Sequence, residues 1–156
     1  MKPRSPLQQG LVLLGFITLT FLAPAVGAFA PPGAWYQTLN KPSWNPPPWI
    51  FGPVWTLLYL GMAVAAWLVW KRAVQGHALR LYFVQLALNA AWTPVFFGAH
   101  QPGAALIVIG FLWMAIFLTL RAFQAVSRPA GLLLVPYLVW VTFASVLNFT
   151  LWRLNS

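Results

Sequence analysis

The stretch Lys41-Pro-Ser-Trp-Asn-Pro-Pro-Pro-Trp-Ile-Phe-Gly-Pro-Val-Trp-Thr-Leu-Leu-Tyr59 decides how this chain is organised. It places five prolines and three tryptophans among nineteen residues, between two apolar spans. Pro42 and Pro46–Pro48 fix φ and lack a backbone N–H, so the first part can be neither helix nor central strand. Pro53 is tolerated in the first turn of a helix. We therefore expect a structured loop that ends by starting a helix near Phe51.

Two interpretations of this aromatic stretch are open. Trp55 and Tyr59 are four residues apart and share one face of the expected helix. A rigid aromatic loop followed by an aromatic helix face is typical of the lid and wall of a site for a flat, apolar ligand. The alternative is an aromatic belt at a membrane surface, where tryptophan and tyrosine are enriched.

The composition indicates a membrane protein. Hydrophobic residues make up 61% of the chain and charged residues only 6%, whereas soluble domains carry roughly a quarter charged residues. Asp and Glu are absent, which excludes carboxylate acids, bases and triads. Cys is absent too, which excludes disulfides and thiolate chemistry. His77 and His100 are expected on opposite sides of the membrane and cannot share a metal ion. We therefore expect no metal, no cofactor and no ordinary catalytic residue.

Five apolar spans are expected, at about residues 11–30, 51–70, 79–97, 104–120 and 130–152. The predicted fold is an all-α bundle of five transmembrane helices, with a long structured loop between the first two, in a single domain over residues 1–156. The first span has features of a signal peptide, but its length of about 20 residues and Pro31–Pro32 directly after it favour a retained helix. Pro24 and Gly27 are expected to kink this helix or to allow a close neighbour.

The positive charges predict an orientation. The net charge is +9, yet the Lys and Arg residues are scattered at the ends of spans rather than gathered in a patch, so we expect membrane lipid and no nucleic acid as a partner. Seven lie on one side of the five spans and two on the other. The positive-inside rule then predicts a bacterial cell membrane protein with a cytoplasmic N-terminus. The seven are Lys2, Arg4, Lys71, Arg72, Arg80, Arg121 and Arg128, and the two are Lys41 and Arg153.

Polar and aromatic residues inside the spans are candidate ligand contacts. Gln85 and Asn89 form an amide pair four residues apart, and Trp92 continues their face. Asn89 is suited either to a ligand carbonyl or to a hydrogen bond between helices. Trp140 and Ala144 share a face of the fifth span in the same way.

Four sequence blocks, in order, resemble the translocator protein (TspO/MBR) family, once called peripheral benzodiazepine receptors. The resemblance covers about residues 20–155. The blocks are Lys41-Pro42-x-Trp44-Asn45-Pro46-Pro47, Pro53-Val-Trp55-Thr-x-x-Tyr59, Asn89-x-x-Trp92-x-Pro94-x-Phe96-Phe97, and Pro136-Tyr137-Leu-x-Trp140 leading to Leu147-Asn148.

The resemblance implies a five-helix bundle, usually a homodimer, with one ligand cavity per subunit capped by the first loop. It implies binding, transport or stress sensing of porphyrins and other flat apolar ligands, such as sterols or benzodiazepine-type drugs. The residues that match the family's blocks imply a cavity closed by two loop residues and lined by six others. The loop pair is Tyr36 and Trp44, and the lining is Trp55, Tyr59, Asn89, Trp92, Trp140 and Ala144.

Two other functions stay open beside ligand binding. One is an enzyme that breaks down porphyrin in light or with an oxidant, in which case Trp55 and Trp140 would carry the activity. The other is a regulatory membrane protein whose loop docks a protein partner. One departure matters: Phe149 stands where a cholesterol-recognition motif near the C-terminus needs Tyr, so the resemblance does not carry over high-affinity cholesterol binding.

Overall fold

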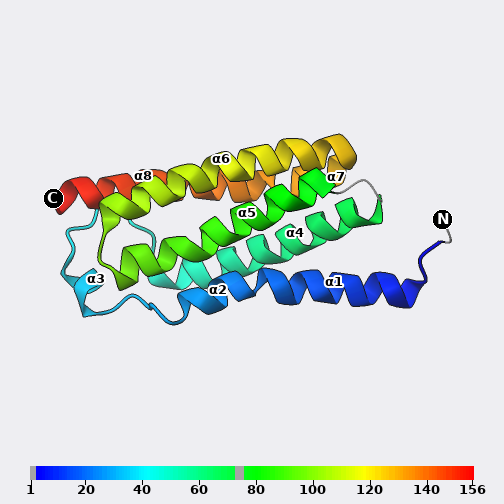
Figure 1. The fold of residues 1–156 in the computed structure, drawn as a ribbon. Coiled ribbons are helices and arrows are strands. Elements are labelled where there is room, and N and C mark those ends of the chain that lie inside the picture. Colours follow the sequence, from blue (N-terminus) through cyan, green and yellow to red (C-terminus); the bar gives the residue numbers. More distant parts are fainter. Residues whose placement is uncertain (1–2, 73–75) are drawn as a thin grey trace.

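The regular elements of the chain are all helices in the computed structural model, which describes residues 3–72 and 76–156 (Figure 1). They join into five helices long and apolar enough to cross a membrane, spanning Pro6–Gly27, Pro48–Lys71, Gly76–Gly98, Pro102–Val126 and Arg128–Leu154. This confirms the predicted class. In chain order the elements are α1 (Pro6–Thr20), α2 (Leu22–Gly27), α3 (Ala34–Thr38), the 3₁₀ turn η1 (Pro48–Ile50), α4 (Phe51–Lys71), α5 (Gly76–Thr93), the π-helical turn η2 (Pro94–Gly98), α6 (Pro102–Val126), α7 (Arg128–Leu133) and α8 (Val135–Leu154).

Prolines account for the interruptions within three spans. Pro24 has no N–H to bond to the carbonyl of Thr20, and α1 ends at Thr20. Pro94 begins the π-helical turn that closes the third span. Pro136 stands at the start of α8, directly after the break at Leu134. A kink in the first span is therefore present where the sequence predicts it.

The first helix begins at Pro6 rather than near residue 11. Ser5 forms a capping box with Gln8: the Gln8 N–H donates to Ser5 Oγ at 3.2 Å, and the Ser5 N–H donates to Gln8 Oε1 at 3.0 Å. This cap lies ahead of the apolar run, so hydropathy alone places the helix start too late. The helix also ends at Gly27, before the expected end near residue 30.

The fourth span is longer than the sequence predicts. Its expected end lies near Leu120, with a connection over residues 121–128, but α6 continues to Val126. Phe123 is fully buried and extends the apolar face of α6 past Arg121. Lys2 and residues 73–75 of the second connection lie outside the described residues.

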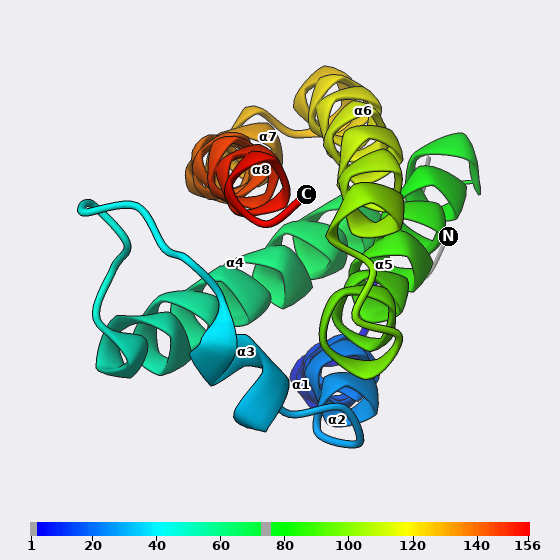
Figure 2. The same ribbon diagram turned by 90° about the vertical axis from the view of Figure 1, so that its left-hand side faces the viewer.

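The loop of residues 28–50 crosses one end of the bundle. Figure 2 looks onto this end and shows the loop (cyan) running from α3 past the C-terminal end of α8 to α4. Within the bundle α5 packs on α6, α6 on α8, α1 on α4, and α4 on α7. Ala63, Ala65 and Ala66 of α4 are completely buried, and such small residues allow close helix packing in lipid.

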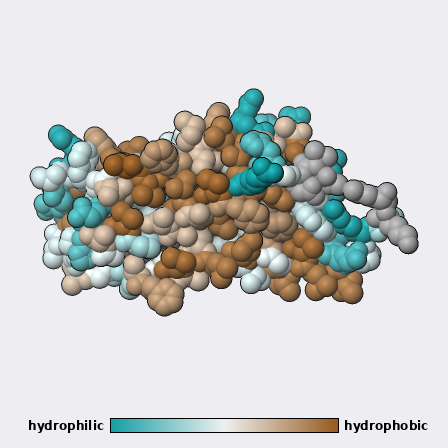
Figure 3. All heavy atoms as spheres, in the orientation of Figure 1, coloured by the Kyte–Doolittle hydropathy of each residue, from teal (hydrophilic) through white to brown (hydrophobic). Residues whose placement is uncertain are grey.

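The surface has the pattern of a membrane protein. Figure 3 shows apolar side chains along the length of the helices, with hydrophilic residues gathered towards the two ends. Large apolar side chains stay exposed on this surface; Leu57, Ile107 and Phe111 are each about two-thirds exposed or more. In water such a surface would aggregate, whereas lipid covers it.

Candidate ligand site beneath the long loop

The loop is held in place by hydrogen bonds at two points. Lys41 Nζ donates to the Tyr36 carbonyl at 2.7 Å and lies 4.5 Å from the centre of the Tyr36 ring. The Asn40 N–H donates to Asn155 Oδ1 at 2.8 Å, and Asn155 Nδ2 donates back to the Asn40 carbonyl at 2.9 Å. Asn155 directly follows α8, so this reciprocal pair fastens the loop to the end of the fifth span.

The two predicted loop residues lie over different spans. The Tyr36 ring packs edge-on against Phe97 of η2, with ring centres 5.3 Å apart. The Trp44 ring packs against Phe143 of α8 at 5.9 Å, while 45% of Trp44 stays exposed. The loop therefore covers both the third and the fifth span.

A chain of buried polar side chains joins three spans below the loop. Tyr59 of α4 donates its hydroxyl to Asn89 Oδ1 of α5 at 2.6 Å. Asn89 Nδ2 donates to the Tyr137 hydroxyl of α8 at 2.8 Å, and that hydroxyl donates to Gln85 Oε1 at 2.8 Å. Gln85 Nε2 in turn points at Met62 Sδ, 3.8 Å away. Buried polar groups in a membrane need such partners, so this cluster fixes α4, α5 and α8 against one another.

Trp55 covers this polar cluster on the side of the loop. Its ring stacks on Tyr59 with ring centres 5.5 Å apart and 28° between the planes. It also meets the edge of Tyr137 at 6.2 Å. Trp55 and Tyr59 thus share one face of α4, as their spacing predicts, and Trp55 is only half-buried. One face of the Trp55 ring is therefore stacked on Tyr59, and Tyr137 lies roughly perpendicular to it.

Trp140 lies in an aromatic group that includes side chains from α4 and α8. Its ring packs against the rings of Phe51 and Phe143, with ring centres 5.9 Å and 5.3 Å apart. Its Nε1 donor is buried and has no hydrogen-bond partner among the described residues. Asn45 Oδ1, in the loop beside Trp44, is likewise a buried acceptor without a partner there. Unpaired buried donors and acceptors are uncommon and call for an explanation.

Trp92 is placed differently from the other tryptophans. Its Nε1 donates to Asn148 Oδ1 at 3.0 Å, and Asn148 Nδ2 donates to the Pro102 carbonyl at 2.9 Å. The ring stacks on Phe96 at 5.0 Å. Trp92 therefore offers a ligand only its ring, because its donor already links α5 to α8. Ala144 is half-buried, one turn beyond Trp140 on α8.

Three residues of this region were not among the candidate contacts from the sequence: Tyr137, which completes the polar cluster with Gln85, and Phe51 and Phe143, which complete the aromatic group. Gln85 carries a usable signal, since an amide one turn before Asn89 inside a span is expected to find a partner. The partners themselves lie far away in the sequence, and no spacing rule identifies them.

The fold and this region define a class of protein: a five-span helical membrane protein in which an aromatic, proline-rich loop closes over a buried tyrosine–amide cluster. Residues 13–153 match the TspO/MBR family, and the chain belongs to that family. This confirms the resemblance seen in the four sequence blocks.

Relatives match over most of their length. The chain is 50% identical to the tryptophan-rich protein TspO of Chlorobaculum tepidum over 137 residues, which cover 84% of this chain and 87% of the relative. It is 48% identical to a tryptophan-rich sensory protein of Cereibacter sphaeroides over 142 residues, covering 88% and 90%. It is 44% identical to the human translocator protein over 149 residues, covering 86% of each chain.

Proposed function

We propose that this protein binds flat, apolar ligands of the porphyrin class between the long loop and the tyrosine–amide cluster, for transport, scavenging or stress sensing. The family and the aromatic composition of the region support this. The proposed contacts are the eight predicted residues, with the loop residues Tyr36 and Trp44 above and the six span residues below. Burial of ring area would supply most of the affinity, at about 25 cal/mol per Å².

The unpaired Nε1 donor of Trp140 is the observation that carries this proposal. Phe51 and Phe143 flank its ring, and the loop lies directly above through the contact of Trp44 with Phe143. A buried donor without a partner is unfavourable in the free protein, and a ligand acceptor would remove this penalty. Porphyrin carboxylates and ring nitrogens supply such acceptors.

Asn89 has a narrower role in this proposal than the resemblance implies. Its Oδ1 already accepts from Tyr59 and its Nδ2 already donates to Tyr137. It therefore contributes by holding Tyr59 beneath Trp55, and only its remaining N–H is open to a ligand. Two further expectations stay predictions: the homodimer, which only the resemblance implies, and the cytoplasmic N-terminus, which the charge distribution supports.

A titration with protoporphyrin IX in the dark tests the proposal. The porphyrin absorbance is followed for the wild type, Trp140→Phe and Trp113→Phe, all purified in the same detergent. Trp140→Phe keeps an aromatic ring and removes the donor, so we expect about tenfold weaker binding, equivalent to about 1.4 kcal/mol. Trp113 is the matched control, because it donates to Thr142 and stacks on Phe117, away from the loop.

The same titration can contradict the proposal. Identical, non-saturating absorbance changes in all three proteins would mean that the porphyrin only partitions into detergent micelles. Illumination of the loaded samples then separates binding from breakdown. Loss of porphyrin at the same rate with and without protein would exclude an enzymatic role, and loss that requires both Trp55 and Trp140 would support one.

A further inference from the structure

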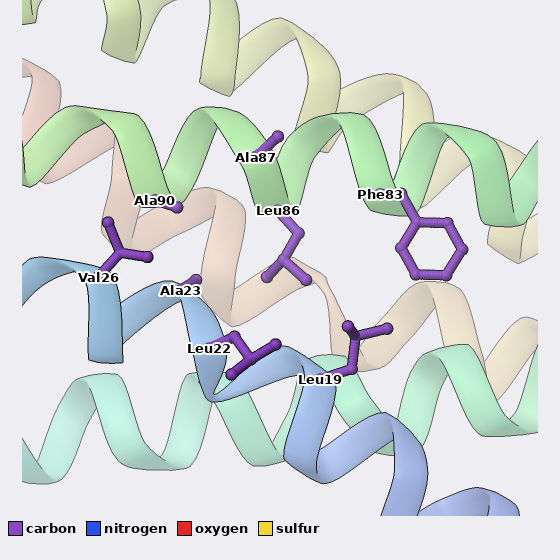
Figure 4. A pocket seen from close by; sticks show the side chains of 8 residues that line it. All are labelled: Leu19, Leu22, Ala23, Val26, Phe83, Leu86, Ala87 and Ala90. Carbon is purple, nitrogen blue, oxygen red and sulfur yellow. The ribbon is translucent and has the colours of Figure 1, made fainter.

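A groove that lies apart from the loop opens on the side of the bundle. It has a volume of about 230 Å³ and lies between the first span and α5 (Figure 4). All the side chains that line it are apolar. Leu19 and Leu22 border it on the first span, and Phe83 and Leu86 point towards them from α5.

Two contacts between the first span and α5 lie next to residues that line the groove. The Thr20 and Tyr82 hydroxyls, adjacent in sequence to Leu19 and Phe83, form a buried hydrogen bond between the two helices. At one end Gly27 lies so close to α5 that a Cβ there would be 3.3 Å from Thr93 Cγ2. Ala23 and Ala87 leave the space between these contacts unfilled. These two contacts hold the first span against α5 on either side of the small residues that line the groove.

The size and chemistry of the groove favour an acyl chain. Its volume is below the range of about 300–1,000 Å³ that is typical for pockets of drug-sized ligands. A macrocycle does not fit, whereas part of one hydrocarbon chain does. The groove opens on a membrane-spanning surface, where lipid chains are always present, and an unfilled recess would forgo dispersion contacts.

Arg80 supplies a charge at the other end of the groove. It precedes Phe83 by three residues and Ala87 by seven, so the three share one face of α5. Arg80 is exposed, and the chain contains no Asp or Glu that could pair with it. Two other basic residues of this end have partners: Arg4 donates to the Trp70 carbonyl at 2.7 Å, and Lys71 Nζ lies 4.3 Å from the centre of the Trp67 ring. The structure gives Arg80 none among the residues that it describes.

We propose that this groove and Arg80 form a binding site for an anionic phospholipid, with one acyl chain between the first span and α5 and the phosphate on Arg80. The N-terminal end of α1, the C-terminal end of α4 and the N-terminal end of α5 are at the same end of the bundle (Figure 1), so Arg4, Lys71 and Arg72 add to the positive potential at that end. A guanidinium binds a phosphate through two parallel hydrogen bonds. Basic pockets between transmembrane helices are a known way to hold acidic lipid headgroups.

Native mass spectrometry of the full chain, with phosphatidylglycerol and phosphatidylcholine of identical acyl chains, tests the headgroup contact. We expect the wild type to retain phosphatidylglycerol in preference to phosphatidylcholine. Arg80→Gln should lower this preference about fivefold. Arg121→Gln, an exposed arginine at the same end on α6, is the matched control and should leave the preference intact.

A second pair of variants tests the acyl-chain contact. Ala87→Phe fills the groove, and we expect it to lower retention of both lipids. Ala91→Phe changes an exposed position one turn further on, outside the groove lining, and should have no effect. All four variants alter exposed side chains, and matching circular dichroism spectra would verify their fold.

Three results would overturn the proposal. They are equal retention of the two lipids by the wild type, equal losses in Arg80→Gln and Arg121→Gln, and dissociation of a dimer by Ala87→Phe but not by Ala91→Phe. The last result would identify the groove as a contact between two copies of the chain.

Discussion

Replacement of Asn89 by Leu is expected to weaken the bundle by an amount that depends on Tyr59. The substitution removes the acceptor of the Tyr59 hydroxyl at 2.6 Å and the donor to the Tyr137 hydroxyl at 2.8 Å. Tyr137 keeps its bond to Gln85, but Tyr59, which is 6% exposed, loses its partner in the cluster. The buried Tyr59 hydroxyl should therefore dominate the effect on stability.

The magnitude follows from these contacts. Hydrogen bonds between transmembrane helices contribute about 0.6 kcal/mol on average, so the two lost bonds account for about 1.2 kcal/mol. An unsatisfied buried hydroxyl adds about 1–3 kcal/mol. We expect Asn89→Leu to lower the free energy of unfolding by about 2–4 kcal/mol, and Tyr59→Phe by about 1 kcal/mol. The double variant should be about 1 kcal/mol more stable than the sum of the single effects predicts.

The wild type, the two single variants and the double variant form a double-mutant cycle. Their free energies of unfolding are measured in mixed detergent and SDS micelles by circular dichroism. Tyr82→Phe is the matched control, because Tyr82 lies on the same helix but bonds to Thr20 instead. Asn89→Leu and Tyr82→Phe should be additive within about 0.5 kcal/mol. Additivity of Asn89→Leu with Tyr59→Phe within that same margin would refute the idea that a buried hydrogen bond couples the two residues.

Two further predictions concern the loop and the first span. Asn155→Ala removes both hydrogen bonds to Asn40 and should increase amide hydrogen exchange in the loop severalfold. Global stability should change little, because the pair is exposed. Unchanged exchange in the loop would show that other contacts hold it. Gly27→Leu should destabilise the protein by about 1–3 kcal/mol through overpacking against Thr93. The control Gly15→Leu has nothing within 4 Å of the new Cβ and should not destabilise, and equal effects at both positions would contradict this packing argument.

The sequence predicts the features that depend on local chemistry. Prolines exclude helix from the middle of the loop, and Pro24 interrupts the first span where its missing donor requires it. The spacing of Trp55 and Tyr59 places them on one face because four residues make about one turn of helix. Hydropathy alone misses the start at Pro6, since a capping box is a side-chain feature that precedes the apolar run.

The contacts between spans could not be predicted in the same way. Asn89 has one partner 30 residues earlier and another 48 residues later, and Trp92 finds Asn148 56 residues away. These pairings depend on the order and rotation of the helices in the bundle, which hydrophobic periodicity does not fix when lipid faces are as apolar as buried faces. An amide inside a span predicts that a partner exists, but not which residue it is.

The positions of the polar groups suggest which part of the structure yields first when a ligand enters. The tyrosine–amide cluster is buried and joins α4, α5 and α8, so separating these helices would expose several unpaired groups to lipid at about 1–3 kcal/mol each. The Asn40–Asn155 pair lies at the exposed end of the bundle, where water replaces a broken hydrogen bond at little net loss. Under the proposed function, entry therefore requires release of the loop from α8 while the three bonded spans stay together. Asn155→Ala should then raise the association and dissociation rates of protoporphyrin IX by similar factors and leave its equilibrium affinity nearly unchanged.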